Sequence, residues 1–371
     1  MTTILVPLDG SELAQRAVPF ARSIASKDGR ALRLLRAINT LSSPTYREGQ
    51  ALLDEAIADL DTYAATVAGD SVQVETRVVD APADVAILEA AAEQDVDLIV
   101  MSTHGRGGLG RWIYGSVADA ILRDAPVPVL IVPPHGLTQW SADAPMKILV
   151  PLDGSELATA AVAPAAALAD RLNATLVLGS VVTFPHYAAY AEGYAFVDPD
   201  PTDSLLTSAR DYLHEVAAGL QQQGRTVEIS ATYGSPFFGV AMMATDISAS
   251  MIVMATHGRG GLARAVMGSV ATATLRQSEV PVLLVRPDEL AREPAAEPAT
   301  PAAVAGPPAK EEQAIALSLS REELDTLILA LGDRFHKEPV DPRNAEPIRL
   351  LLEKLRTARG APALAGATGG R

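Results

Sequence analysis

The sequence predicts an α/β protein that contains two copies of one doubly wound domain. Short runs of Val, Ile and Leu alternate along the chain with segments whose apolar residues recur at helical spacing. This alternation is typical of parallel sheets with helices on both faces. Residues 4–13 recur within 146–157 almost letter for letter, and Ile4 returns as Ile148, an offset of 144. A glycine-rich stretch at 102–117 returns at 255–270 with the same internal spacing.

Composition narrows the class of protein. With 48% hydrophobic but only 4% aromatic residues, the 371-residue chain is expected to build aliphatic cores. The lack of cysteine excludes disulfides, thiolate catalysis and cysteine metal sites. A net charge of −15 argues against a nucleic-acid binder, whose affinity depends on neutralising phosphates. No apolar run reaches the length of a membrane span and the N-terminus has no basic region, so a cytoplasmic protein without membrane contact is expected.

The first copy predicts five strands with helices between them. Ser11 is placed to cap the helix that follows the first strand, and Pro19 lies within that helix and is expected to kink it. A longer helix is expected at about 44–68, with one buried face. That face is expected to hold Leu52, Leu53, Ile57 and Leu60. The strands are predicted at 3–8, 32–38, 72–79, 98–101 and 127–132.

The two copies differ by an insertion. Gly105 returns as Gly258, an offset of 153, so the second copy holds nine more residues between its first strand and its glycine-rich stretch. These are expected within 184–203, an aromatic-rich stretch that is either a lid over the second site or a surface loop packed by its own aromatics. Asp80 is matched with Gly234, and Asp97 with Ser250.

The expected domain boundaries follow from these repeats and from composition. Near the C-terminus, Ser320 and Glu323 form a capping box before leucines at helical spacing, and Pro347 precedes a second such pattern. This predicts two short helices that dock on the α/β core or pair with another copy. The predicted parts are domain 1 at 1–134, a linker at 135–145, domain 2 at 146–287, an Ala/Pro-rich linker at 288–312, a helical hairpin at 313–358 and a disordered tail at 359–371.

The glycine-rich stretches have the chemistry of a phosphate site. Glycine lets the backbone come close to a ligand, and the first turn of the following helix offers unpaired N–H groups at the positive end of its dipole. Arg106 and Arg111, with Arg259 and Arg264 at the same offsets, can add charge-assisted hydrogen bonds. The alternative interpretation is two tight turns with surface arginines.

The spacing of these glycines resembles the nucleotide motif of the universal stress protein family: Gly, two residues, Gly, nine residues, Gly, then Ser or Thr. The matching residues are Gly105, Gly115 and Ser116 in the first copy and Gly258, Gly268 and Ser269 in the second, while Ser102 and Ala255 replace the leading Gly. The resemblance covers about residues 1–287. It implies strand order 3-2-1-4-5 in each five-stranded sheet, a ligand site where strands one and four lie side by side, and pairing of the two domains through their last strands.

The resemblance also implies an adenine nucleotide, ATP with or without Mg²⁺, in each domain. Asp9 and Asp153 each follow a strand and either contact the ribose or a metal-bound water, or satisfy backbone N–H groups of a turn. Ala37 and Val181 match the family position against adenine. The binding residues expected in the first copy are Asp9, Ala37, Ser102, Thr103, His104, Gly105, Arg106, Gly108, Arg111, Gly115, Ser116 and Val117. Those in the second are Asp153, Val181, Ala255, Thr256, His257, Gly258, Arg259, Gly261, Arg264, Gly268, Ser269 and Val270.

No residue is assigned a catalytic role. His104 and His257 have no nearby nucleophile with an acidic partner, and the six histidines show no metal-ligand spacing. The favoured function is a stress-response regulator whose bound nucleotide biases the surface of a dimer of tandem chains or of an unidentified protein partner. A nucleotide-independent interaction protein and a slow ATP hydrolase stay open as alternatives.

Overall fold

The structure, a computed structural model, describes residues 2–42, 45–69, 72–102, 115–141, 144–183, 201–256 and 267–286. The predicted Ala/Pro-rich linker, helical hairpin and tail lie outside these ranges, and so does the insertion up to residue 200. The strands are β1 (Thr3–Pro7), β2 (Ala31–Ile38), β3 (Val74–Asp80), β4 (Val96–Ser102), β5 (Val129–Val132), β6 (Lys147–Pro151), β7 (Thr175–Val182), β8 (Val227–Tyr233), β9 (Met251–Ala255) and β10 (Val282–Val285).

Helices precede or follow nearly every strand. They are α1 (Glu12–Gln15), α2 (Ala17–Asp28), α3 (Tyr46–Val67), α4 (Ala83–Ala91), α5 (Ser116–Asp124), α6 (Glu156–Thr159), α7 (Val162–Leu172), α8 (Pro201–Gln221), α9 (Pro236–Asp246) and α10 (Ser269–Gln277), with a short 3₁₀ turn at Thr40–Ser42. Within the described ranges no helix is both long and apolar enough to cross a membrane.

All ten strands form one sheet in the order β3-β2-β1-β4-β5-β10-β9-β6-β7-β8. Each half therefore has the predicted order 3-2-1-4-5, and all pairings within a half are parallel. The halves join through β5 and β10, which pair antiparallel with Leu283 opposite Leu130. This confirms that the copies pair through their last strands within one chain. The two predicted five-stranded sheets are thus halves of a single sheet, and their carboxyl ends lie at opposite edges.

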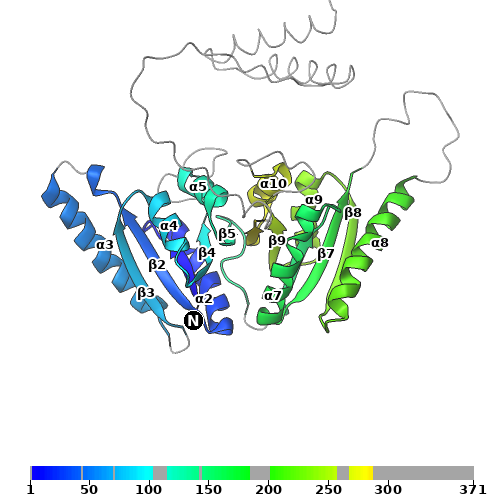
Figure 1. Cartoon of the computed structure of the whole chain (residues 1–371), viewed down its shortest axis with the longest axis horizontal. Coiled ribbons are helices and arrows are strands. Elements are labelled where there is room, and N and C mark those ends of the chain that lie inside the picture. The colour runs from blue at the N-terminus through cyan, green and yellow to red at the C-terminus, as the bar shows by residue number, and fades with distance from the viewer. Residues whose placement is uncertain are drawn as a thin grey trace, which may run out of the picture. The chain divides into compact units, whose positions relative to one another are not determined.

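Helices cover both faces of this sheet (Figure 1). On one face α2, α3, α7 and α8 pack on alternate strand residues such as Ile4 and Ile148. On the other face α4, α5, α9 and α10 pack on the intervening residues, such as Leu5 and Leu149. Each hydrophobic cluster takes side chains from both halves. The halves therefore share both cores, which agrees with their assignment to one compact unit, Met1–Glu297.

One prediction about the first helix is confirmed, and the structure changes the other. The hydroxyl of Ser11 accepts a hydrogen bond from the Ala14 backbone N–H at 3.1 Å and caps α1. The predicted kink is a break, because α1 ends at Gln15 and α2 begins at Ala17, which places Pro19 in the first turn of α2. Proline is tolerated there because the first-turn N–H groups have no partner within the helix.

The predicted buried face of α3 is wrong. Leu52 and Ile57 are each 46% exposed, and of the four predicted residues only Leu60 is buried. The buried face instead runs through Ala56, Leu60, Ala64 and Val67. Alanines on this face let the helix approach the sheet closely, so small residues rather than the largest apolar ones mark the contact.

The segment between β5 and β6 is fastened to both halves near Gly136. The backbone N–H of Leu137 donates to the carbonyl of Glu279 at 3.0 Å. Arg16 of α2's N-cap donates through Nη2 to the carbonyl of Leu137 at 3.1 Å. Gly136 itself has φ +82°, and a Cβ there would lie 2.1 Å from the carbonyl oxygen of Glu279. The close approach of two backbones therefore requires glycine at this position.

Trp140 anchors the same segment further along. Its ring meets Phe20 of α2 edge to face, with centroids 5.0 Å apart and planes at 81°. Its indole Nε1 donates to the backbone carbonyl of Ser250, just before β9, at 2.8 Å. Trp140 is buried in the core that the two halves share. A stretch predicted only as a linker thus contributes a core side chain.

Candidate functional site

The predicted site residues converge at the carboxyl ends of neighbouring strands. β1 lies between β2 and β4, so the turn carrying Asp9 emerges beside Ser102, the last residue of β4. The second half repeats this arrangement, with Asp153 after β6 and Ala255 ending β9. Strand order reverses at this point in each half, which is where open α/β sheets bind their ligands.

The two aspartates organise tight turns. One oxygen of Asp9, Oδ1, accepts hydrogen bonds from the backbone N–H of Ser11 at 2.9 Å and from its hydroxyl at 2.6 Å. Asp153 makes the same pair of bonds with Ser155, also at 2.9 and 2.6 Å. The turn role predicted as one alternative is therefore present in both halves. Contact with a ribose or a metal-bound water stays a prediction.

Ser102 presents a buried hydroxyl at the end of β4. The residue is 7% exposed, and its Oγ has no hydrogen-bond partner in the part of the chain that the structure describes. A buried polar group without a partner costs about 1–3 kcal/mol, so such groups usually mark a ligand, a water or a functional role. In the second half the position belongs to Ala255, and Thr256 follows it.

The helices that follow the glycine-rich stretches begin without a side-chain cap. Gly115 occupies the N-cap of α5 with φ −52°, and Gly268 that of α10 with φ −55°. These angles are accessible to any residue, and a Cβ on Gly115 would meet no atom within 4 Å. Neither backbone strain nor packing against the described residues thus requires glycine at position 115. Among the described residues, no side chain caps the first-turn N–H groups of Ser116 and Val117.

The base of the second glycine-rich loop is closed by a backbone bond. The N–H of Gly268 donates to the carbonyl of Thr256 at 2.8 Å, and the N–H of Thr256 donates to Val285 of β10 at 3.0 Å. The start of α10, with Ser269 and Val270, is therefore held next to the end of β9. The loop is thus tied to the strand through which the halves pair.

Much of the predicted site lies outside the described residues. These residues are Thr103, His104, Gly105, Arg106, Gly108 and Arg111 in the first half and His257, Gly258, Arg259, Gly261 and Arg264 in the second. In the described ranges, no group of three or more His, Asp or Glu side chains could hold a metal ion.

Ala37 and Val181 occupy matching places near the carboxyl ends of β2 and β7 and face α4 and α9. Val181 packs on Gly239 of α9, where a Cβ would lie 2.6 Å from Val181 Cγ1. Ala86, the residue of α4 that matches Gly239 at the offset of 153, is buried. The pair Val181 and Gly239 in the second half thus corresponds to the pair Ala37 and Ala86 in the first. The sequence analysis did not predict that the sizes of these two side chains depend on each other.

Replacing Gly239 by alanine is expected to destabilise the chain by about 1–2 kcal/mol, because the new methyl overpacks against a stiff β-branched side chain. The double variant Gly239→Ala, Val181→Ala reproduces the Ala37–Ala86 pair of the first half and should relieve that clash. A double-mutant cycle from urea unfolding measures the coupling. Strictly additive effects of the two changes would contradict this packing.

The register corrects one predicted difference between the copies. Asp80 lies opposite Ile38, and Tyr233 lies opposite Val182, the residue that matches Ile38 at the offset of 144. Asp80 therefore corresponds to Tyr233 and not to Gly234. The predicted match was one residue off because α4 has proline at its N-cap, whereas α9 has it in the first helical position.

Asp80 fastens the turn after β2 to the end of β3. Its Oδ2 accepts from the Thr40 hydroxyl at 2.6 Å and its Oδ1 from the Thr40 backbone N–H at 2.9 Å. These bonds, the hydroxyl first, favour the ionised carboxylate and lower the pKa of Asp80 below its usual value. Folding is therefore stabilised by this group above the unfolded-state pKa of about 4, and that contribution is lost as the pH falls through the lower folded-state pKa.

The variant Asp80→Asn is expected to be less stable than the wild type at neutral pH, and the difference should shrink as the pH falls below about 4. Urea unfolding of both proteins between pH 7 and pH 3 measures it. A difference that stays constant over this range would mean that the carboxylate charge is not what holds the turn.

Comparisons with known proteins agree with this geometry. The sequence profile of the Universal stress protein family matches residues 1–133 and 145–286. A universal stress protein of Mycolicibacterium smegmatis is 27% identical over 53% of this chain and 64% of its own length, so the chain spans less than two thirds of the first relatives that it matches. A universal stress protein of Mycobacterium tuberculosis is 27% identical over 76% of this chain and 96% of its own.

Solved structures show the same architecture. The crystal structure of a universal stress protein from Archaeoglobus fulgidus superposes with a TM-score of 0.59 at 20% identity, covering 76% of this chain and 98% of the other. At 20% sequence identity, this similarity shows a shared fold and nothing more specific.

Proposed function

The chain belongs to the universal stress protein family, and on that premise we propose that it is a regulatory protein that binds an adenine nucleotide, ATP, in its two halves. The observation that supports a ligand most directly is the buried hydroxyl of Ser102, which has no hydrogen-bond partner among the described residues and lies beside a helix start without a side-chain cap. A polyanion with several acceptor oxygens fits both, because hydroxyl and N–H groups donate to it.

Each part of the nucleotide has complementary residues at this edge. The first-turn N–H groups of Ser116 and Ser269 bind a phosphate group at the positive end of the helix dipole. Arginines of the two glycine-rich stretches neutralise its charge: Arg106, Arg111, Arg259 and Arg264. Ala37 and Val181 offer the apolar contact that an adenine ring requires. Asp9 and Asp153 follow the adjacent strands, where a carboxylate can accept from ribose hydroxyls.

The regulatory step is a change that the bound nucleotide makes in the glycine-rich loop and at the start of the helix after it. α5 and α10 lie on the same face of the sheet near the pairing of β5 and β10, so a ligand at their N-termini acts close to the junction of the halves (Figure 1). A nucleotide that binds one arrangement of this junction more tightly shifts the population toward it. The surface that changes serves a second chain or another protein partner.

A calorimetric titration of the full chain with ATP tests this function. Two ATP molecules per chain are expected, with unequal affinities because the halves differ at Ser102 and Ala255. GTP is the control, since the apolar contact at Ala37 and Val181 supplies no partner for the extra polar groups of guanine. Absence of heat and of thermal stabilisation with either nucleotide would contradict the proposal.

One specific observation favours a second candidate, a nucleotide-independent interaction protein. Ser102 and Ala255 both stand where the family motif has its leading glycine. Under this alternative the chain assembles identically with and without nucleotide. Slow hydrolysis of ATP, a cytoplasmic location and a dimer of tandem chains also stay predictions.

A further inference from the structure

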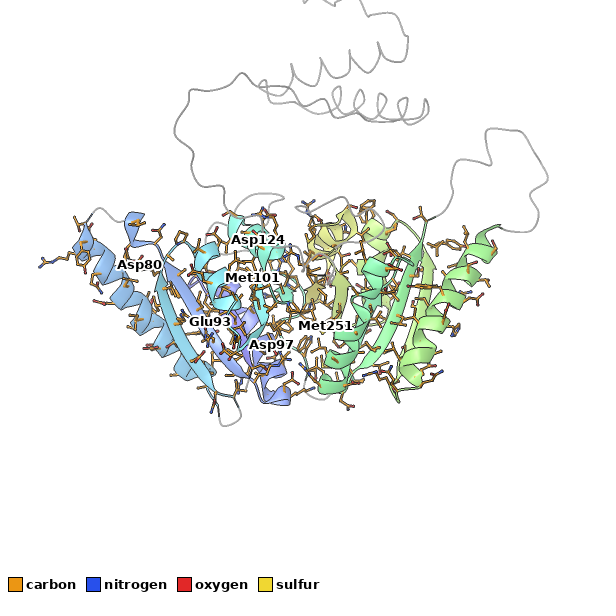
Figure 2. The ribbon with its side chains drawn as sticks, in the orientation of Figure 1. Asp80, Glu93, Asp97, Met101, Asp124 and Met251 are labelled. Carbon is orange, nitrogen blue, oxygen red and sulfur yellow. The ribbon has the colours of Figure 1, made fainter. Side chains whose placement is uncertain are left out.

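A cavity of about 220 Å³ lies between α2 and α7 where the two halves meet. Ile24 and Leu168 line it from the two helices, and Leu98 and Leu283 line it from strands on either side of the junction. Figure 2 labels two more of its lining residues, Asp97 and Met251, near the middle of the sheet. The walls are thus mainly aliphatic and come from both halves.

Charged groups form one side of this cavity. Arg30 is buried and donates through Nη1 to Asp97 Oδ1 at 2.8 Å, while its Nη2 lies 3.0 Å from Asp28 Oδ2. Arg171 of α7, about half exposed, is 3.6 Å from the same oxygen of Asp28. The cavity therefore combines apolar walls with two guanidinium groups and a carboxylate, Asp97, that can accept a further hydrogen bond.

The internal repeat indicates what such a space holds. At the repeat offsets, Pro164 of α7 matches Phe20 of α2, and Asp97 matches Ser250. The indole of Trp140 fills the space between Phe20 and Ser250 and donates its N–H to the latter. The cavity is lined by Pro164 and Asp97, the matching pair on the other half. Among the described residues, no aromatic side chain occupies this second position.

We propose that this cavity is a binding site for a small planar aromatic molecule with an N–H or O–H donor, which sits as Trp140 sits in the related position. The space is partly open to solvent, and its volume exceeds the roughly 150 Å³ of an aliphatic cavity that holds benzene, so a small aromatic ring fits in it. Arg30 and Arg171 favour an aromatic ring over an aliphatic one through cation–π attraction. Asp97 replaces the carbonyl of Ser250 as acceptor for the donor group.

This site is separate from the nucleotide site proposed above. It lies among α2 and α7, whereas α5 and α10 cover the opposite face of the sheet. Because its walls come from both halves, an occupant contacts both sides of the β5–β10 junction. The molecule would therefore brace the arrangement of the halves, as Trp140 does on the other side.

Indole is the probe that tests the proposal on the full chain. In methyl NMR spectra, the signals of Ile24, Leu168 and Leu283 are expected to shift and saturate at one indole per chain, with a Kd on the order of 1 mM for so small a ligand. Benzofuran has the same shape and no donor, and it is expected to bind about fivefold more weakly. Equal affinities would overturn the assignment of Asp97 as acceptor.

The variant Trp140→Ala supplies the matched control, because it empties the related position. It is expected to bind two indole molecules per chain. The molecule in the proposed cavity should shift the same methyl signals as in the wild type. The proposal is overturned if the methyl signals of these three residues show no saturable shift in the wild type. It is also overturned if the variant binds indole and the wild type does not. Neither result depends on ATP binding, so failure here is distinguishable from failure of the proposed function.

Discussion

Replacing Gly136 by alanine is expected to destabilise the chain by about 2–4 kcal/mol. Two costs add at this position. The backbone angle φ +82° is strained for any residue with a Cβ, and that Cβ would lie 2.1 Å from the Glu279 carbonyl oxygen and 2.7 Å from its carbonyl carbon. Both neighbours are backbone atoms, so no side chain can turn away. The variant must therefore loosen the contact between the β5–β6 segment and the second half.

Gly224 provides the matched control for this prediction. It has the same φ of +82°, but a Cβ there would meet nothing within 4 Å. Gly224→Ala is expected to cost only about 1 kcal/mol, which is the backbone strain alone. Urea unfolding of the two variants separates the terms. Equal losses would show that the junction adjusts freely, and that Gly136 matters only for its backbone angle.

The double variant Gly115→Val, Gly268→Val is expected to weaken ATP binding by roughly 100-fold or more while leaving the fold intact. At φ near −55° and ψ near 150° valine is unstrained, and no described residue lies within 4 Å of a Cβ placed on Gly115. The side chain would stand in the space above the first-turn N–H groups, where the proposed phosphate binds. Loss of two charge-assisted hydrogen bonds accounts for about 3 kcal/mol, and each 1.4 kcal/mol is a factor of ten.

Each single valine variant serves as a control for the double variant. It is expected to retain one of the two ATP molecules, with the affinity of the unaltered half nearly unchanged. Calorimetry gives the number of sites, and circular dichroism confirms the fold. Unchanged ATP affinity in a folded double variant would remove the helix N-termini from the site.

Local patterns predicted most of the architecture because the chain repeats itself. The strands and the Ser11 cap depend on residues close in sequence, whereas the kink predicted at Pro19 is instead a break at Arg16. The strand order and the pairing of the last strands were implied by the resemblance. What the sequence could not give depends on contacts between distant residues. The burial of Trp140, which lies in a predicted linker, was missed because its partners Phe20 and Ser250 are more than 100 residues away on either side.

The errors have equally specific causes. Large apolar residues predicted the wrong face of α3, because a close helix–sheet contact selects alanine and leaves Leu52 and Ile57 outside. Of the candidate site, the sequence correctly placed the turns at Asp9 and Asp153 and the helix starts at Gly115 and Gly268. It could not show that the hydroxyl of Ser102 is buried and has no hydrogen-bond partner among the residues that the structure describes, which only the packing around β4 determines.

The central claim is that the two halves hold adenine nucleotide, and the protein as purified tests it most directly. Heat denaturation releases any bound ligand, which chromatography with mass detection identifies and counts per chain. The account predicts ATP, or another adenine nucleotide, at one to two equivalents, with the weaker half losing part of its share during purification. No released nucleotide, followed by no binding of added ATP, would contradict the account and leave the glycine-rich stretches as structural turns.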